Sequence, residues 1–226
     1  MGEIILAMTG GFLGIAVNIL FFRGIERIII YKCNQRKIEI PELNISAWVK
    51  AVFFILQILL YMSAFYLMPV TGAVFTCVFV TVALGNAIID FYTHIIANET
   101  ILFLFAAGTL YRLYEGGRNS YIGSLLAILI IIMAFGCAAV IIYWKKGILG
   151  VGAGDLKMSL AAALTVGYPG VMYFIGGMAV SLIVYCLGGI KSGFLTTNSY
   201  FPMCPQISAG FIIALFYPYV EALGLF

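Results

Sequence analysis

The stretch Tyr121–Trp144 reads YIGSLLAILIIIMAFGCAAVIIYW and contains no aspartate, glutamate, lysine or arginine. A helix needs about 20 apolar residues to cross the hydrocarbon core of a bilayer, and this stretch has that length. Its apolar residues are continuous rather than alternating, which favours a helix over a strand of a membrane β-barrel. The stretch therefore predicts a membrane-spanning helix in an integral membrane protein.

The composition of the whole chain also indicates a membrane protein. Hydrophobic residues make up 64% of the 226 residues and charged residues only 9%, against roughly 45–50% and 25% in a typical soluble domain. The mean hydropathy is +1.12. A soluble fold of this size would lack the polar groups to cover its surface, so we expect lipid around it. The net charge of +3 is too small to indicate nucleic-acid binding.

Further apolar runs, bounded by charged residues, proline or glycine, predict the other spans. Together they predict an all-α membrane protein, a polytopic bundle of about eight transmembrane helices. We expect one membrane domain over residues 1–226, with residues 24–47 as a short cytosolic loop. The predicted spans are Ile4–Phe22, Trp48–Met68, Ala73–Phe91, Ile101–Leu113, Tyr121–Trp144, Leu156–Tyr168, Val171–Ile190 and Ile207–Leu225.

The distribution of lysine and arginine predicts the orientation, because cytosolic loops of membrane proteins are enriched in these residues. With the N-terminus outside, only Arg112 and Arg118 lie on the outer side. The inner side then holds Arg23, Arg27, Lys32, Arg36, Lys37, Lys50, Lys145, Lys146, Lys157 and Lys191. This strong bias predicts that the N-terminus and the C-terminus both lie outside.

Asp90 and Asp155 are the only aspartates in the chain, and the predicted topology places both at the cytosolic membrane face. A carboxylate beside lipid is energetically costly, so an ionisable residue there is a functional candidate. When two carboxyls lie close together, repulsion between like charges raises the pKa of one of them. One is then protonated while the other is ionised, which is the state that activates a water and protonates a leaving amine.

Each aspartate also has a purely structural interpretation. Asp155 begins a predicted span, and an aspartate at the start of a helix is often a cap. Asp90 ends a predicted span, where the helix dipole disfavours a negative charge, so capping does not explain it. A salt bridge from Asp90 to Lys146 or Lys157 is the structural alternative there.

Residues 150–157 carry the motif that is easiest to compare with known families. Gly152-Ala153-Gly154-Asp155 resembles the GxGD signature of intramembrane aspartyl proteases. The longer pattern formed by Gly150, Gly152, Gly154, Asp155 and Lys157 resembles the form found in type IV prepilin peptidases.

Three further segments resemble the same family, in the same order along the chain. Asp90 followed by Ile96-Ala97-Asn98 is similar to the segment that carries the family's other catalytic aspartate. Gly11-Phe12-Leu13-Gly14, with Asn18 and Arg23 after it, resembles the family's first span. Residues 201–210, which begin Phe-Pro and end Ala-Gly, resemble the proline-rich entry to its last span.

The resemblance implies an aspartic-type endopeptidase in the inner (cytoplasmic) membrane of a bacterium or archaeon. It would remove the short, basic leader of type IV prepilins or pseudopilins at the cytosolic membrane face. The resemblance implies that Asp90 and Asp155 are the catalytic pair. It also implies a set of supporting motif residues, which are Gly150, Gly152, Gly154, Lys157, Ile96 and Asn98. The implied partners are the prepilin substrate and the lipid bilayer, with no nucleic acid, cofactor or metal.

The chain departs from the family pattern at two places. Ala97 stands where the family usually has proline, so we expect a less rigid turn after Asp90. The larger bacterial enzymes carry two cysteine pairs in the first cytosolic loop, which are tied to methylation of the new N-terminus. Residues 24–47 contain only Cys33. We therefore expect a peptidase without N-methyltransferase activity.

Three alternatives remain, two of other classes and one within the proteases. A non-catalytic membrane scaffold would have no reason to concentrate its only aspartates at one membrane face. A proton- or ion-coupled transporter also carries carboxylates in the membrane, but it usually has charges deeper in its spans and related halves. A presenilin-like or signal-peptide-peptidase-like protease shares the GxGD motif. The segment around Asp90 fits the prepilin type better.

Overall fold

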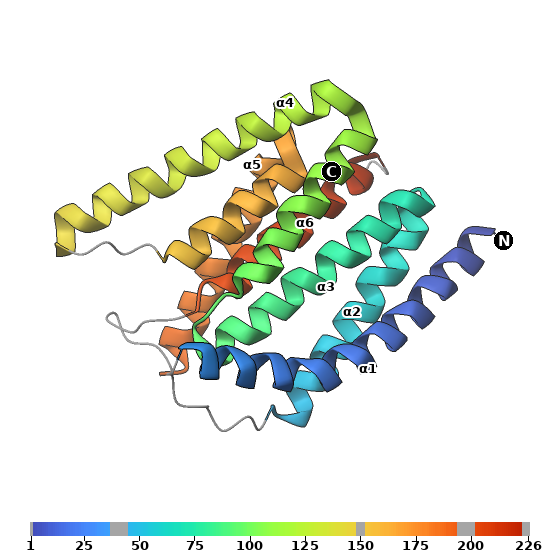
Figure 1. Ribbon diagram of the computed structural model, residues 1–226, viewed down its shortest axis with the longest axis horizontal. Coiled ribbons are helices and arrows are strands. Elements are labelled where there is room, and N and C mark those ends of the chain that lie inside the picture. The colour runs from blue at the N-terminus through green and yellow to red at the C-terminus, as the bar shows by residue number, and fades with distance from the viewer. Residues whose placement is uncertain (1, 37–44, 148–151, 194–201, 223–226) are drawn as a thin grey trace. The chain divides into compact units, whose positions relative to one another are not determined.

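The computed structural model describes residues 2–36, 45–147, 152–193 and 202–222. All the elements in these residues are helices (Figure 1). The all-α prediction is therefore confirmed for this part of the chain. The helices are α1 (Gly2–Arg36), α2 (Ala47–Leu67), α3 (Val70–Thr93), α4 (Asn98–Lys146), α5 (Ala153–Lys191) and α6 (Cys204–Ala222).

Within the described residues, five helical stretches are long and apolar enough to cross a membrane. These stretches are Gly2–Gln35, Ala47–Leu67, Val70–Thr93, Asn119–Lys145 and Ala153–Lys191. The chain is thus an all-α, multi-pass membrane protein. The presence of about eight spans, and their orientation, stay predictions.

The chain divides into two compact units, Met1–Ile95 and Ile96–Phe226. The first unit contains α1 to α3 and the second contains α4 to α6. Asp90 belongs to the first unit and Asp155 to the second.

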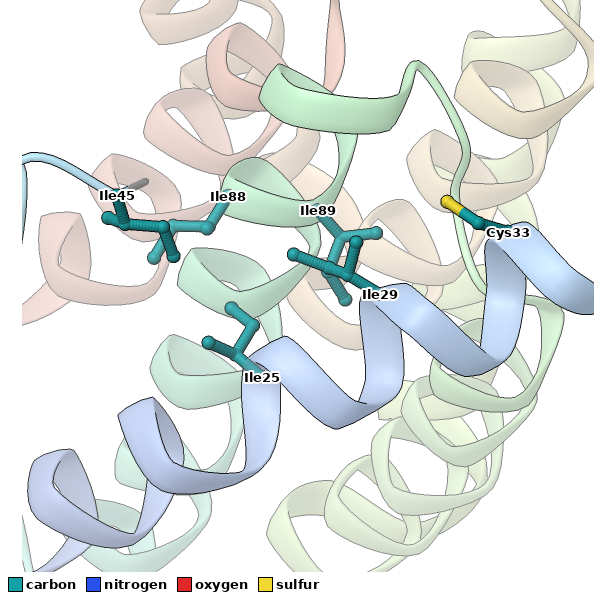
Figure 2. Close-up of a cluster of buried hydrophobic side chains, with 6 residues drawn as sticks. All are labelled: Ile25, Ile29, Cys33, Ile45, Ile88 and Ile89. Atoms are coloured by element: carbon teal, nitrogen blue, oxygen red, sulfur yellow. The ribbon is translucent and has the colours of Figure 1, made fainter. Parts of the chain in front are cut away.

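In the first unit, α1 is longer than the sequence predicted, and Figure 1 shows it bending between its two halves. The predicted span ended at Phe22 and the predicted loop began at residue 24, but the helix continues to Arg36. The continuation has an apolar face, because Ile25, Ile29 and Cys33 recur every fourth residue and are buried. Figure 2 shows them clustered with the remaining buried members, Ile45, Ile88 and Ile89.

Buried polar groups join the helices of the first unit. The side-chain amide of Asn18 in α1 donates to Gln57 Oε1 in α2 at 2.8 Å. The Tyr61 hydroxyl in α2 donates to the carbonyl oxygen of Cys77 in α3 at 3.1 Å. Such bonds satisfy polar side chains that would otherwise be costly inside a membrane.

In the second unit, α4 and α5 each contain a break at a glycine. Gly117 has φ 55° and ψ −134°, and Gly167 has φ 62° and ψ −173°. Glycine adopts such backbone angles readily because it has no Cβ atom. The first break lies between two predicted spans, Ile101–Leu113 and Tyr121–Trp144, and Figure 1 shows α4 bending there. The second break lies at the end of the predicted span Leu156–Tyr168.

The Arg112 side chain in α4 contacts the residues around both breaks. Its Nη1 donates to Glu115 Oε2 at 2.6 Å, and its Nε donates to Ser124 Oγ at 3.1 Å. Its Nη2 donates to the carbonyl oxygen of Ser120 at 3.2 Å. A Cβ atom at Gly167 would collide with the guanidinium, so the second break depends on glycine for space as well as conformation.

Candidate active site

Asp90 lies one turn before the end of α3 and is buried, with 5% of the residue exposed. His94 ends the helix in the left-handed conformation, with φ 51°. The backbone N–H of His94 donates to the carbonyl oxygen of Asp90 at 2.8 Å. The helix end is therefore closed by the main chain, and the Asp90 carboxyl has no capping role at the negative end of the helix dipole.

Asp155 is the third residue of α5, and the N-cap position belongs to Gly152. The structural alternative, in which Asp155 is the N-cap residue, does not hold, because the helix begins at Ala153. In the first turn, the positive end of the helix dipole stabilises the ionised form of a carboxyl. The two aspartates thus occupy opposite electrostatic environments with respect to their own helices.

The first glycine of the GxGD motif makes room for the Asp155 carboxyl. A Cβ atom built at Gly152 would collide with Asp155 Oδ2. That oxygen therefore lies against the backbone at the start of α5, in space that any residue other than glycine would fill. Gly152 has ordinary extended backbone angles, with φ −69° and ψ 132°, so the role of this glycine is steric rather than conformational.

The second glycine of the motif packs against the segment that follows Asp90 in the sequence. A Cβ atom at Gly154 would lie 3.4–3.5 Å from three carbon atoms of the Ile96 side chain. This distance is ordinary van der Waals contact, so the site is close-packed but would accept an alanine. Ile96 itself is buried, with 6% of the residue exposed.

Lys157 makes a second connection between the same two segments. Its Nζ donates a hydrogen bond to Asn98 Oδ1 at 3.3 Å. Asn98 is the first residue of α4 and Lys157 is the fifth residue of α5. Both side chains are exposed. Two motif segments that lie far apart in the sequence are therefore joined by one apolar contact and one polar contact inside the second unit.

The structure thus brings together Ile96 with Gly154 and Asn98 with Lys157, and it places Gly152 beside Asp155. Gly150 lies outside the described residues. The pairing of Asp90 with Asp155 stays a prediction, since the two residues belong to different units. In the described part of the chain, no group of three or more His, Cys, Asp or Glu side chains is suited to hold a metal ion.

Two buried polar residues near the aspartates were missed by the sequence analysis. Asn86 in α3 and Ser159 in α5 are both fully buried, with 0% exposed. Each lies four residues from an aspartate, on the side toward the middle of its helix. The spacing of four, within an otherwise apolar run, is the signal that could have identified them.

The sequence of the chain was compared with known protein families, curated proteins and solved structures. Residues 74–192 match the sequence profile of the type IV leader peptidase family. The matched region covers more than half of the chain and includes Asp90, Asn98, Asp155 and Lys157. Searches of curated proteins and of solved structures gave no match.

Proposed function

Because the chain belongs to the type IV leader peptidase family, we propose that it cleaves the short, basic leader from type IV prepilins or pseudopilins at the cytosolic membrane face. The enzyme is an aspartic-type endopeptidase whose catalytic pair is Asp90 and Asp155. Family membership makes the chain a peptidase; the identity of the pair and of the substrate is the proposal.

One observation carries the proposal. The region that matches the family contains both of the chain's aspartates, and four of the proposed supporting residues contact one another in pairs inside the second unit. Ile96 and Asn98, which follow Asp90 in the sequence, contact Gly154 and Lys157, which flank Asp155. A hydrolase that uses two carboxyls from distant segments needs such contacts to hold those segments in register.

The proposed chemistry follows from two carboxyls that share one proton. The ionised carboxyl takes a proton from a water molecule, which attacks the carbonyl carbon of the scissile peptide bond. The protonated carboxyl stabilises the oxygen of the tetrahedral intermediate and then supplies a proton to the leaving amine. The two carboxyls titrate as a pair, so neither role is assigned to one residue.

The proposed topology suits this substrate. With about eight spans and both termini outside, the C-terminal end of α3 and the N-terminal end of α5 face the cytosol. Asp90 and Asp155 then lie at the depth where a cytosolic leader joins a transmembrane helix. A prepilin that lies in the membrane with its leader in the cytosol would present its scissile bond there.

We also propose that the cleaved product leaves this enzyme unmethylated. A methyl donor needs an enclosed pocket, and ligand pockets are usually about 300–1,000 Å³. Helix α1 extends to Arg36, so only residues 37–46 connect it to α2. Cys33, the single cysteine of the predicted loop, is buried in the core of the first unit.

The test is to incubate the purified protein with a panel of leader-bearing prepilins and to map the products by mass spectrometry. We expect one cut at the junction between the leader and the hydrophobic helix. With S-adenosylmethionine present, we expect no methyl group on the new N-terminus. The absence of cleavage across the panel would contradict the peptidase assignment, and stoichiometric methylation would contradict the second claim.

A further inference from the structure

Helix α3 ends one turn after its aspartate, at a residue with an uncommon backbone conformation. His94 has φ 51° and ψ 32°, which lies in the left-handed region. Among the described residues, it is the only residue other than glycine with a positive φ. Residues with a side chain avoid this region, because the Cβ atom comes too close to the following carbonyl oxygen. A strained backbone residue of this kind is a reason to look for a function.

The left-handed conformation directs the His94 N–H to the carbonyl oxygen of Asp90, at 2.8 Å. Helices often end in this way, usually at glycine and sometimes at asparagine, and the bond satisfies one of the last carbonyl groups of the helix. The Thr93 hydroxyl adds a bond to the carbonyl oxygen of Ile89 at 2.7 Å. The backbone of the turn that carries Asp90 is therefore closed on its C-terminal side.

The His94 side chain is exposed, whereas the residues before Asp90 and after His94 are buried. Ile88 and Ile89 belong to the core of the first unit, and Ile95 is also buried. Burial thus anchors the chain on both sides of the turn, and the conformation of His94 sets the path of the backbone between these anchors. The structure requires a left-handed backbone at position 94 rather than an imidazole.

The charge that the proposed mechanism needs destabilises this turn. The helix dipole disfavours a negative charge near the C-terminal end of a helix, and the effect is confined to the last turn. Asp90 lies in that turn. Its ionised form therefore favours fraying of the residues that carry it, and fraying would displace the carboxyl from a reactive geometry. A closed helix end opposes this fraying.

We propose that His94 is a positioning residue, whose left-handed backbone closes the last turn of α3 and so holds the Asp90 carboxyl in its catalytic position. The imidazole takes no part in the chemistry. The catalytic meaning of this role rests on the proposed function, but the closure of the helix end does not.

Variants of the full-length protein in lipid nanodiscs separate the backbone of His94 from its side chain. His94→Gly and His94→Asn remove the imidazole and keep the left-handed region accessible. His94→Val and His94→Thr also remove the imidazole, but they disfavour that region because both side chains are branched at Cβ. Threonine is polar and therefore suits the exposed position.

Gly193→Val is the matched control, because it strains a helix end of another kind, far along the chain from both aspartates. Gly193 follows α5 with φ 73°, and its N–H donates to the carbonyl oxygen of Ile190 at 3.1 Å. Gly193→Val should lower the melting temperature and leave kcat unchanged.

Prepilin cleavage and amide hydrogen exchange are measured on each protein. We expect His94→Val and His94→Thr to lower kcat about tenfold at unchanged KM, and to speed exchange in the last turn of α3 about tenfold. His94→Gly and His94→Asn should keep kcat within about twofold of the wild type. Wild-type kcat in the branched variants, equal losses in His94→Gly and His94→Asn, or an equal loss in Gly193→Val would each overturn the proposal.

Hydrogen exchange separates this proposal from the proposed function. If the wild type cleaves no prepilin, the proposed function fails, and faster exchange in the two branched variants alone still supports closure of the helix end by His94. If the wild type cleaves and the last turn of α3 exchanges equally in all the variants, the positioning role fails alone.

Discussion

The ammonium of Lys157 donates a hydrogen bond to Asn98 Oδ1 at 3.3 Å, and this bond joins the first turn of α4 to the first turns of α5. Both residues come from segments that resemble catalytic motifs, but neither is an acid or base of the proposed mechanism. The bond connects the start of α5, which carries Asp155, to the segment that follows Asp90 in the sequence.

A double-mutant cycle tests this bond. We expect Asn98→Ala and Lys157→Met each to lower kcat/KM roughly twofold to tenfold, the range for one exposed hydrogen bond. The double variant should be no worse than the more affected single variant, because both substitutions remove the same interaction. Steady-state cleavage of a prepilin supplies the rates, and fully additive losses would show that the two residues act separately.

Alanine substitutions at the two motif glycines, Gly152 and Gly154, should lower activity to different degrees. Gly152→Ala should lower kcat by about a hundredfold, because its Cβ displaces the Asp155 carboxyl from its position, while thermal stability changes little. Gly154→Ala should lose far less activity, since its Cβ makes only van der Waals contact with Ile96. Turnover and melting temperature are measured on both proteins. Equal losses of activity would contradict this steric account.

The break in α5 gives a prediction for stability alone. Gly167→Ala should lower the free energy of unfolding by about 1–3 kcal/mol, because a residue with a Cβ atom is strained at φ 62° and ψ −173°. The collision with Arg112 adds to this cost. Gly136→Ala in α4 is the matched control, since a Cβ there meets no atom within 4 Å. Denaturant unfolding in mild detergent compares them, and equal stabilities would contradict the proposed role of Gly167.

Cysteine labelling tests the topology. In a variant without native cysteines, single cysteines at residues 94 and 148 should react only with a reagent supplied from the cytosolic side. Cysteines at residues 70 and 117 should react only from outside, as the distribution of lysine and arginine predicts. Reaction from outside at residue 94 would move Asp90 away from the cytosol and remove the proposed substrate geometry.

Much of the fold could be predicted from the sequence because lipid demands long apolar helices. The predicted span Trp48–Met68 and the observed α2, Ala47–Leu67, differ by one residue at each end. The isoleucines Ile25, Ile28, Ile29 and Ile30 suggest that the first helix continues past Phe22, but its end at Arg36 could not be predicted in the same way. Its last turns are stabilised by burial of Ile25 and Ile29 against Ile88 and Ile89, which is a tertiary effect.

Part of the candidate site could also be predicted from the sequence, and part could not. Asp90 and Asp155 stand out in the sequence because charge is rare in this chain. The steric role of Gly152 depends on the rotamer of Asp155 and on the residue at which α5 begins, and neither is visible in the motif. The complete burial of Asn86 and Ser159 is likewise visible only in the structure.

The most direct test of the central claim is the prepilin cleavage rate of purified Asp90→Asn and Asp155→Asn. We expect no cleavage product from either variant, with helix content by circular dichroism equal to that of the wild type. The reason is that the two carboxyls act as one unit, and a single carboxyl cannot supply both the base and the acid. Near wild-type turnover in either variant would show that Asp90 and Asp155 are not the catalytic pair.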